Sequence, residues 1–135
     1  MFLLYPVNAI FLHATLRSTD QCDRQCNTEI IVNQLQNYND GNYAAKLCAY
    51  LVAFGFDDWY LPAAGELATL YQQLGPTDNG FDGSGDITLG DYWSSTERGY
   101  DQFYDHLVWG QRFWGPGHQM VIDNFFSIRC RCVRK

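Results

Sequence analysis

The sequence predicts a single α+β domain spanning residues 1–135. Apolar residues recur at helical spacing in the first half, and short alternating segments dominate from Tyr92 onward. A Gly- and Asp-rich stretch, residues 76–91, separates the two regions and reads as a long ordered loop. This order predicts a small twisted antiparallel sheet flanked by two or three helices, with long irregular loops. A length of 135 residues gives room for one hydrophobic core.

Composition narrows the classes of function. The chain is 47% hydrophobic and 18% charged, which favours a packed domain over disorder. A net charge of −6 repels phosphate backbones and anionic lipid, so we expect no nucleic-acid partner. The apolar run Met1–Ala14 contains Pro6 and lacks a basic start and a cleavage pattern. We interpret it as a strand pair rather than a signal peptide, and expect no membrane insertion, which needs ~20 apolar residues.

Three helices are expected. Asn27 is a candidate N-cap for the first, which should end before the break at residues 39–42. The second should run from about Tyr43 to Phe54 and stop at Gly55. The third should begin at Pro62 and carry an apolar stripe made of Leu67, Leu70, Tyr71 and Leu74.

Alternation predicts the strands and their faces. One face of the first long strand should carry Leu107, Trp109 and Phe113. The opposite face should carry Val108, Arg112 and Trp114, which places Trp114 outward if the first three residues point inward. A turn at residues 115–117 leads to a return strand with Met120 and Ile122. In the terminal strand, Arg129 and Arg131 should face away from Phe126, Ile128, Cys130 and Cys132.

Several short strings carry a family resemblance. Asp58 to Pro62 reads Asp-Trp-Tyr-Leu-Pro and is followed by Glu66-Leu67, and residues 92–97 read Tyr-Trp-Ser-Ser-Thr-Glu. The chain ends with Arg-Cys-Val-Arg at residues 131–134. From about residue 27 to the end, the chain resembles the C-type-lectin-like domain of the type that ends the Legionella collagen-like adhesin and recurs in bacterial and phage proteins. The resemblance implies core roles for Trp59, Trp93 and Trp109, and turn-capping hydroxyls at Ser94, Ser95 and Thr96.

Five cysteines suggest structural use. Helical spacing places Cys48 beside Ala44, Leu47 and Leu51, so a bridge to Cys132 or Cys130 would join this helix to the last strand. The family resemblance favours Cys132. Cys22 and Cys26 are candidates for a local bridge. Free thiols, or a zinc site formed by Cys22, Cys26, Cys130 and Cys132, are the alternatives.

The sequence contains little that indicates a metal site, a cofactor or catalysis. The loop at residues 78–86 offers oxygen ligands that suit calcium, with Asp78, Asp82 and Asp86 as candidates, although a solvated turn-rich loop explains the same residues. We expect no other cofactor. The three histidines are far apart and lie in no catalytic motif, so we do not expect an enzyme.

An excess of aromatic residues among polar ones, between residues 98 and 127, is typical of a recognition surface. We expect a module that binds a surface glycan or protein, as an adhesin or phage receptor-binding domain would, outside the cell or on a virion. The alternative is a structural subunit of a virion or surface complex, with this face buried in a homo-oligomer such as a trimer or in a larger assembly. The candidate ligand-binding residues are Tyr100, Phe103, Tyr104, His106, Arg112, Trp114, Asp123, Asn124 and Phe125.

Overall fold

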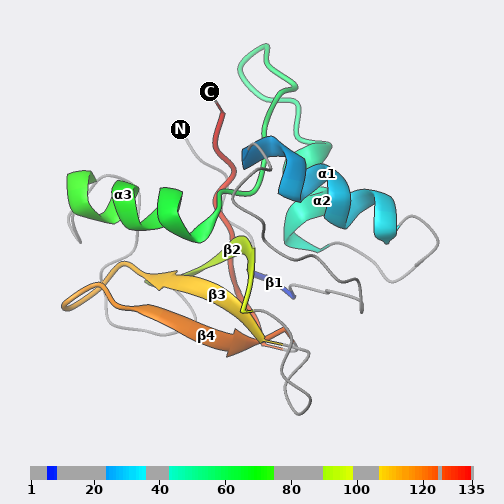
Figure 1. Cartoon of the computed structure of the whole chain (residues 1–135). Coiled ribbons are helices and arrows are strands. Elements are labelled where there is room, and N and C mark those ends of the chain that lie inside the picture. The colour runs from blue at the N-terminus through cyan, green and yellow to red at the C-terminus, as the bar shows by residue number, and fades with distance from the viewer. Residues whose placement is uncertain are drawn as a thin grey trace.

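The computed structural model describes residues 6–8, 24–35, 43–74, 90–98, 107–124 and 126–134. These residues form an α+β fold, as the sequence predicts, with the helices gathered on one side of a sheet (Figure 1). The helices are α1 (Arg24–Gln34), α2 (Ala44–Ala49) and α3 (Ala64–Leu74), and the strands are β1 (Pro6–Asn8), β2 (Asp91–Glu97), β3 (Leu107–Arg112), β4 (Gln119–Asp123) and β5 (Ser127–Arg129). None of the described helices is long and apolar enough to cross a bilayer.

The sheet has five strands in the order β1-β5-β2-β3-β4. Neighbouring strands are antiparallel except β2 and β5, which are parallel, with Tyr92 opposite Arg129. The expected antiparallel sheet is therefore wrong at this junction. After β4 the chain crosses to the far edge of β2 instead of forming another hairpin, and this crossover sets the parallel direction. Of the strand pair expected in residues 1–14, the described part contains β1.

Helix α1 begins earlier than expected. It starts at Arg24, so Asn27 lies inside the helix and is not its N-cap. The buried Thr28 hydroxyl accepts a hydrogen bond of 3.0 Å from the amide of Leu61 and lies 3.3 Å from the Leu61 carbonyl oxygen, to which it donates. Thr28 thus satisfies both backbone groups of a buried residue outside any strand, which ties α1 to the segment before α3.

Helix α2 ends earlier than expected, at Ala49. A tight turn follows, in which Phe54 and Gly55 adopt φ angles of 57° and 81° and Ala53 and Phe56 exchange two backbone hydrogen bonds of 3.0 Å. Two consecutive positive φ angles are the geometry of a type I′ hairpin turn. Gly55 therefore lies in a hairpin turn and does not end the helix. Leu51 and Ala53, two residues apart, both pack against the core from this extended segment. This is the spacing of a strand, not of the helix expected here.

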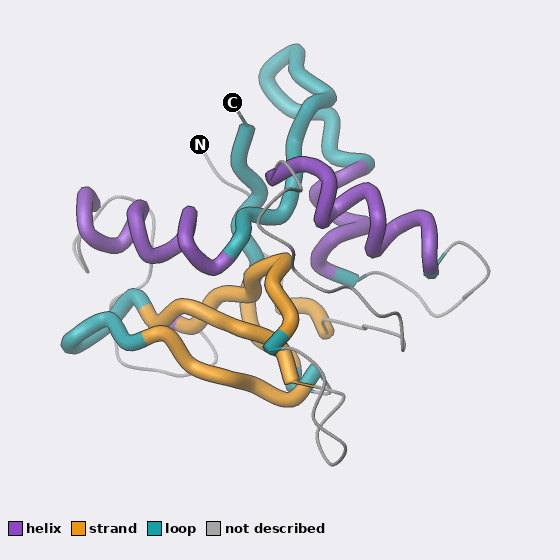
Figure 2. The backbone as a smooth tube through the Cα atoms, viewed as in Figure 1, coloured by secondary structure: helices purple, strands orange, loops and turns teal. Residues whose placement is uncertain are grey.

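Helix α3 forms where it is expected, but it begins at Ala64, two residues after the predicted start at Pro62 (Figure 2). The Ala63 amide donates a hydrogen bond of 2.9 Å to Oε2 of Glu66, as in a capping box. Oε1 of Glu66 accepts a second bond, also 2.9 Å, from the Tyr60 hydroxyl. The predicted stripe is confirmed, because Leu67 is fully buried against Tyr92 and Phe113, and the rest of the stripe packs around it: Leu70, Tyr71 and Leu74.

The larger core cluster lies between α1, α2 and the sheet. Trp93 is fully buried there and Trp59 is nearly so, which confirms both as core residues. Trp109 is only half-buried and lies outside both clusters, so its predicted core role is wrong. Val108, expected on the outer face, is buried in this cluster, while Phe113 is buried beneath α3. Both faces of β3 are covered in part, so simple alternation cannot identify one inward face.

A disulfide joins α2 to the C-terminal segment. It links Cys48 to Cys132, with the two Cα atoms 5.2 Å apart and a sequence separation of 84 residues. This is the pairing that the family resemblance implies. Closing so long a loop in the unfolded chain stabilises the fold by about 4.5 kcal/mol on the chain-entropy estimate.

Two of the three hydroxyl residues after Trp93 satisfy backbone groups, within β2 rather than in a turn. The Ser95 hydroxyl is buried and has no hydrogen-bond partner among the described residues, so the capping role that the resemblance implies for it is wrong. The register of β2 against β3 shifts between Trp93 and Glu97, as at a β-bulge. There the Ser94 hydroxyl donates to the Trp109 carbonyl and accepts from the Thr96 amide. The Thr96 hydroxyl accepts a 3.0 Å bond from the amide of Ala64, which is one of the free donors at the start of α3.

Candidate functional site

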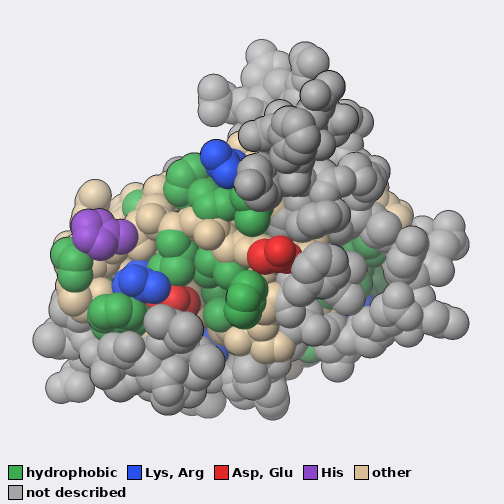
Figure 3. Space-filling view, turned by 90° about the horizontal axis from the view of Figure 1, so that it is seen from below, with side chains coloured by type: hydrophobic (Ala, Val, Ile, Leu, Met, Phe, Trp, Pro, Cys, Tyr) green, Lys and Arg blue, Asp and Glu red, His purple; other side chains and the backbone are tan. Residues whose placement is uncertain are grey.

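The β3–β4 hairpin has one face toward α3 and one face away from it. On the α3 side, Phe113 packs against Tyr71 with ring centroids 5.7 Å apart, and the Gln119 side chain donates a 2.7 Å bond to the Ala64 carbonyl. Arg112 alternates to the opposite face. Seen from below, this underside of the molecule gathers hydrophobic side chains next to acidic and basic ones (Figure 3).

The Asp91 cluster, formed by Asp91, Arg112 and Trp114, lies on this underside. Nε of Arg112 donates a 3.1 Å bond to Oδ1 of Asp91, and its Nη2 lies 3.3 Å from Oδ2. The indole nitrogen of Trp114 donates to Oδ1 at 3.2 Å. Asp91 is buried with a side chain only 4% exposed, and these charge-assisted bonds offset the loss of its water.

The same cluster fixes an aromatic ring against a cation. The central guanidinium carbon of Arg112 lies 4.2 Å from the centroid of the Trp114 ring, within the range of a cation–π contact. Nη2 also lies 3.7 Å from the Met120 sulfur. The third guanidinium nitrogen, Nη1, has no hydrogen-bond partner among the described residues, and the Arg112 side chain is 26% exposed. The cluster therefore holds an indole against a guanidinium that remains partly exposed in the described part of the chain.

The structure divides the predicted ligand-binding residues. Arg112 and Trp114 come together, but Asp123 pairs opposite Leu107 at the other end of the hairpin. The length of β3 separates these ends by roughly 17 Å. Asn124, next in the chain, is buried. The other predicted ligand-binding residues lie outside the described part of the chain, namely Tyr100, Phe103, Tyr104, His106 and Phe125, and so do the calcium candidates Asp78, Asp82 and Asp86.

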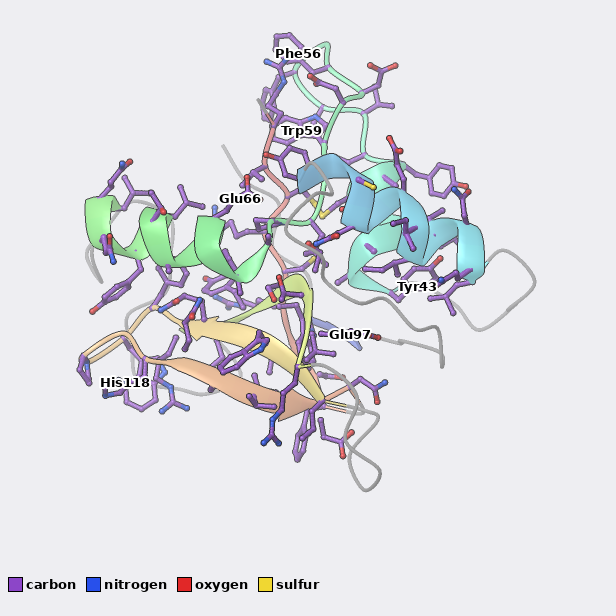
Figure 4. The ribbon with its side chains drawn as sticks, viewed as in Figure 1. Tyr43, Phe56, Trp59, Glu66, Glu97 and His118 are labelled. Atoms are coloured by element: carbon purple, nitrogen blue, oxygen red, sulfur yellow. A yellow bond between two sulfur atoms is a disulfide. The ribbon has the colours of Figure 1, made fainter. Side chains whose placement is uncertain are left out.

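Asp91 is a site residue that no sequence motif indicates. Asp91 and Arg112 are Cα partners across β2 and β3, so an opposite-charge pair would have been evident once the strand register was known. The register could not be read from the sequence because the long segment between the two strands fixes no turn. His118 lies exposed at the β3–β4 turn (Figure 4), and its backbone carbonyl accepts a 3.1 Å hydrogen bond from the Arg112 amide.

A shallow groove of about 290 Å³ lies between α3 and the C-terminal segment. Its polar groups already serve the fold, because Glu66 caps α3 and accepts the Tyr60 hydroxyl, and Arg134 pairs with Asp58. This makes it a weaker candidate than the Asp91 cluster. The groove is lined by Tyr60, Gly65, Glu66, Thr69, Leu70, Val133 and Arg134.

Three buried sulfur atoms converge in the core. The sulfurs of Cys48, Cys130 and Cys132 lie within 4.8 Å of one another, and Cys130 is a free thiol. Burial raises the pKa of the Cys130 thiol to about 12. Cys26 and Cys132 are both disulfide-bonded, so neither can serve as a thiolate ligand in the zinc site considered above. The proposed partner of Cys26, Cys22, lies outside the described residues.

The sequence was also compared with known proteins. No protein-family model matches the chain, and no curated protein matches it.

Proposed function

We propose that the chain is a ligand-recognition module that binds a surface glycan or protein through Arg112 and Trp114. The observation that carries this proposal is the attachment of both side chains to the buried carboxylate of Asp91. A half-buried indole that is held in place loses little conformational freedom when a ligand stacks on it. Rigid aromatic rings next to an Arg are the residues that contribute most to many binding surfaces.

A C-type-lectin-like fold is part of the same proposal. Two features support it, namely the Cys48–Cys132 bridge, which the family resemblance implied, and a small sheet with helices in an α+β order. The disulfide also fits a protein that works in an oxidising compartment, such as the cell surface or a virion. The adhesin or receptor-binding role proposed from the sequence is consistent with that location.

The experiment begins with a glycan array probed with the purified chain. The tightest glycan is then titrated against wild type, Trp114→Ala and Trp114→Phe. We expect Trp114→Ala to weaken binding at least tenfold, because it removes the stacking surface. Trp114→Phe keeps a ring but loses the bond to Asp91, so its loss should be smaller.

The matched control is Tyr50→Ala, which removes an aromatic side chain that is 68% exposed at the end of α2. It should bind the glycan like wild type. Equal binding by Trp114→Ala and wild type would reject the proposal. A stable homo-oligomer that buries Trp114, with no glycan bound, would instead favour the structural-subunit alternative.

A further inference from the structure

A second surface is strongly apolar and lies apart from the Asp91 cluster. Four of the five exposed large hydrophobic residues in the described chain fall within the seven positions 50–56, which we name the apolar hairpin. It protrudes beyond the helices, and Figure 4 places Phe56 near its outer end. The four residues and their exposed fractions are Tyr50 at 68%, Val52 at 74%, Phe54 at 55% and Phe56 at 43%.

The exposure follows from how the hairpin is anchored. Leu51 and Ala53 pack against the core, so alternation directs Tyr50 and Val52 outward. Phe54 then occupies the first central position of the type I′ turn with a φ of 57°, a conformation that favours Gly, Asn or Asp and disfavours a bulky residue. The fold therefore holds an exposed aromatic ring at a position where a small polar residue would be more stable.

The C-terminal segment braces the second strand of the hairpin. The Arg134 guanidinium lies 3.5 Å from the centroid of the Phe56 ring and forms two hydrogen bonds, of 2.8 and 2.9 Å, with the Asp58 carboxylate. Trp59 adds a 3.2 Å bond from its indole nitrogen to the Phe56 carbonyl. These contacts limit the freedom of the hairpin, and a rigid element binds with a smaller loss of entropy than a loose one.

We propose that the apolar hairpin inserts into a hydrophobic pocket, rimmed by basic residues, on another protein. A convex apolar tip is complementary to a concave apolar site. Residues 50–58 contain no Lys or Arg, and Arg134, which packs on Phe56, is paired with Asp58. The exposed Asp57 carboxylate beside Phe56 is left for a partner, so basic side chains at the rim would complete the match. The proposal goes beyond the glycan- or protein-binding role of the Asp91 cluster, because it concerns a different surface.

Charge argues against two other occupants. In a symmetric pair of copies the two Asp57 carboxylates would approach each other, in chains of net charge −6. The same acidic charge repels anionic lipid, and the basic neighbour of the hairpin, Arg134, is already paired with Asp58.

The probe for the test is a random 12-residue peptide library displayed on phage. It is selected on wild type and counter-selected on Phe54→Asn, a substitution that gives the turn the Asn-Gly pair it favours. We expect the recovered peptides to combine apolar residues with Lys or Arg. A synthetic peptide of this kind should bind wild type at least tenfold more tightly than Phe54→Asn or Val52→Ser. Phe126→Ala, which removes a ring that is 63% exposed elsewhere, should bind like wild type.

Stability separates a binding role from a structural one. Phe54→Asn should melt at the same temperature as wild type or higher while losing the peptide, as expected where function keeps an unfavourable residue in place. A lower melting temperature would show that Phe54 serves the fold, and the proposal would fall. The proposal would also be rejected if no peptide distinguished wild type from Phe54→Asn. It would be rejected if wild type formed dimers in sedimentation experiments and Phe54→Asn did not. Binding to vesicles of phosphatidylcholine with phosphatidylglycerol that depended on Phe54 would reject it too. Trp114→Ala should leave peptide binding unchanged, which keeps this test independent of the Asp91 cluster.

Discussion

The indole nitrogen of Trp114 donates a 3.2 Å hydrogen bond to Oδ1 of Asp91, a residue 23 positions earlier in the chain. Because the same oxygen also accepts from Arg112, one buried carboxylate positions both proposed binding residues. In the proposed site, Asp91 therefore positions the two binding residues and does not itself contact the ligand.

Asp91→Asn tests this arrangement. The amide keeps the size of the side chain but removes the charge that Arg112 pairs with, so we expect unfolding to become easier by about 1–3 kcal/mol. Urea unfolding measures the change, and glycan binding should weaken as well. Asp57→Asn, at an exposed carboxylate, is the control and should change neither quantity. Full stability in Asp91→Asn would show that the carboxylate does not hold the cluster.

Trp93→Ala should behave in the opposite way to Trp114→Ala. Trp93 is fully buried in the larger core cluster, and removing it leaves a cavity that costs about 3–5 kcal/mol. That loss is a large fraction of the stability of an ordinary domain, so the variant should be mostly unfolded by circular dichroism at 37 °C. A folded Trp93→Ala protein that had lost only ligand binding would contradict the core assignment.

The Cys130 thiol should make the fold sensitive to alkali. Burial raises its pKa to about 12 in the folded state, above the ~8.5 of a free thiol. Between these values the unfolded chain loses the proton and the folded chain keeps it. Ionisation of Cys130 therefore leaves the free energy of unfolding unchanged below pH 8.5. Above that pH it lowers the free energy of unfolding by about 1.4 kcal/mol per pH unit.

Cys130→Ala isolates this effect from the other groups that titrate in alkali. Denaturant unfolding between pH 8 and 10.5 should show a shallower loss of stability in the variant than in wild type. The same burial predicts that iodoacetamide modifies Cys130 only after unfolding. Parallel pH profiles for the two proteins, or rapid labelling of native Cys130, would show that the thiol is not buried in a low-dielectric site.

The ion pair between Asp58 and Arg134 predicts a measurable pKa. Hydrogen bonds from Arg134 lower the pKa of the Asp58 carboxyl below its usual value of 3.8. The stabilisation from this pair is present above that value and disappears as pH falls through the folded pKa. A carboxyl-carbon NMR titration should show the lowered pKa in wild type and its return toward 3.8 in Arg134→Gln. An unchanged Asp58 pKa in the variant would show that Arg134 does not brace the apolar hairpin through Asp58.

The sequence by itself determined the local elements whose signals are complete within a few residues. The stripe of Leu67, Leu70, Tyr71 and Leu74 predicted α3, since helical spacing places these side chains on one face. Glu66 at the start of this helix supplied its cap. The α+β class followed from the same kind of periodicity. Periodicity alone did not determine the pairing of Cys48 with Cys132, because it left Cys130 equally acceptable as the partner. Only the family resemblance favoured Cys132.

Tertiary structure decided the features that depend on distant partners. The burial of Val108 and the exposure of part of Trp109 depend on which helix covers each end of β3, and no alternation pattern contains that information. The end of α2 and the apolar hairpin depend on whether Leu51 and Ala53 gain more from packing against the core than from another helical turn. The Asp91 cluster depends on the register of β2 against β3, which a long intervening segment leaves open until the sheet forms.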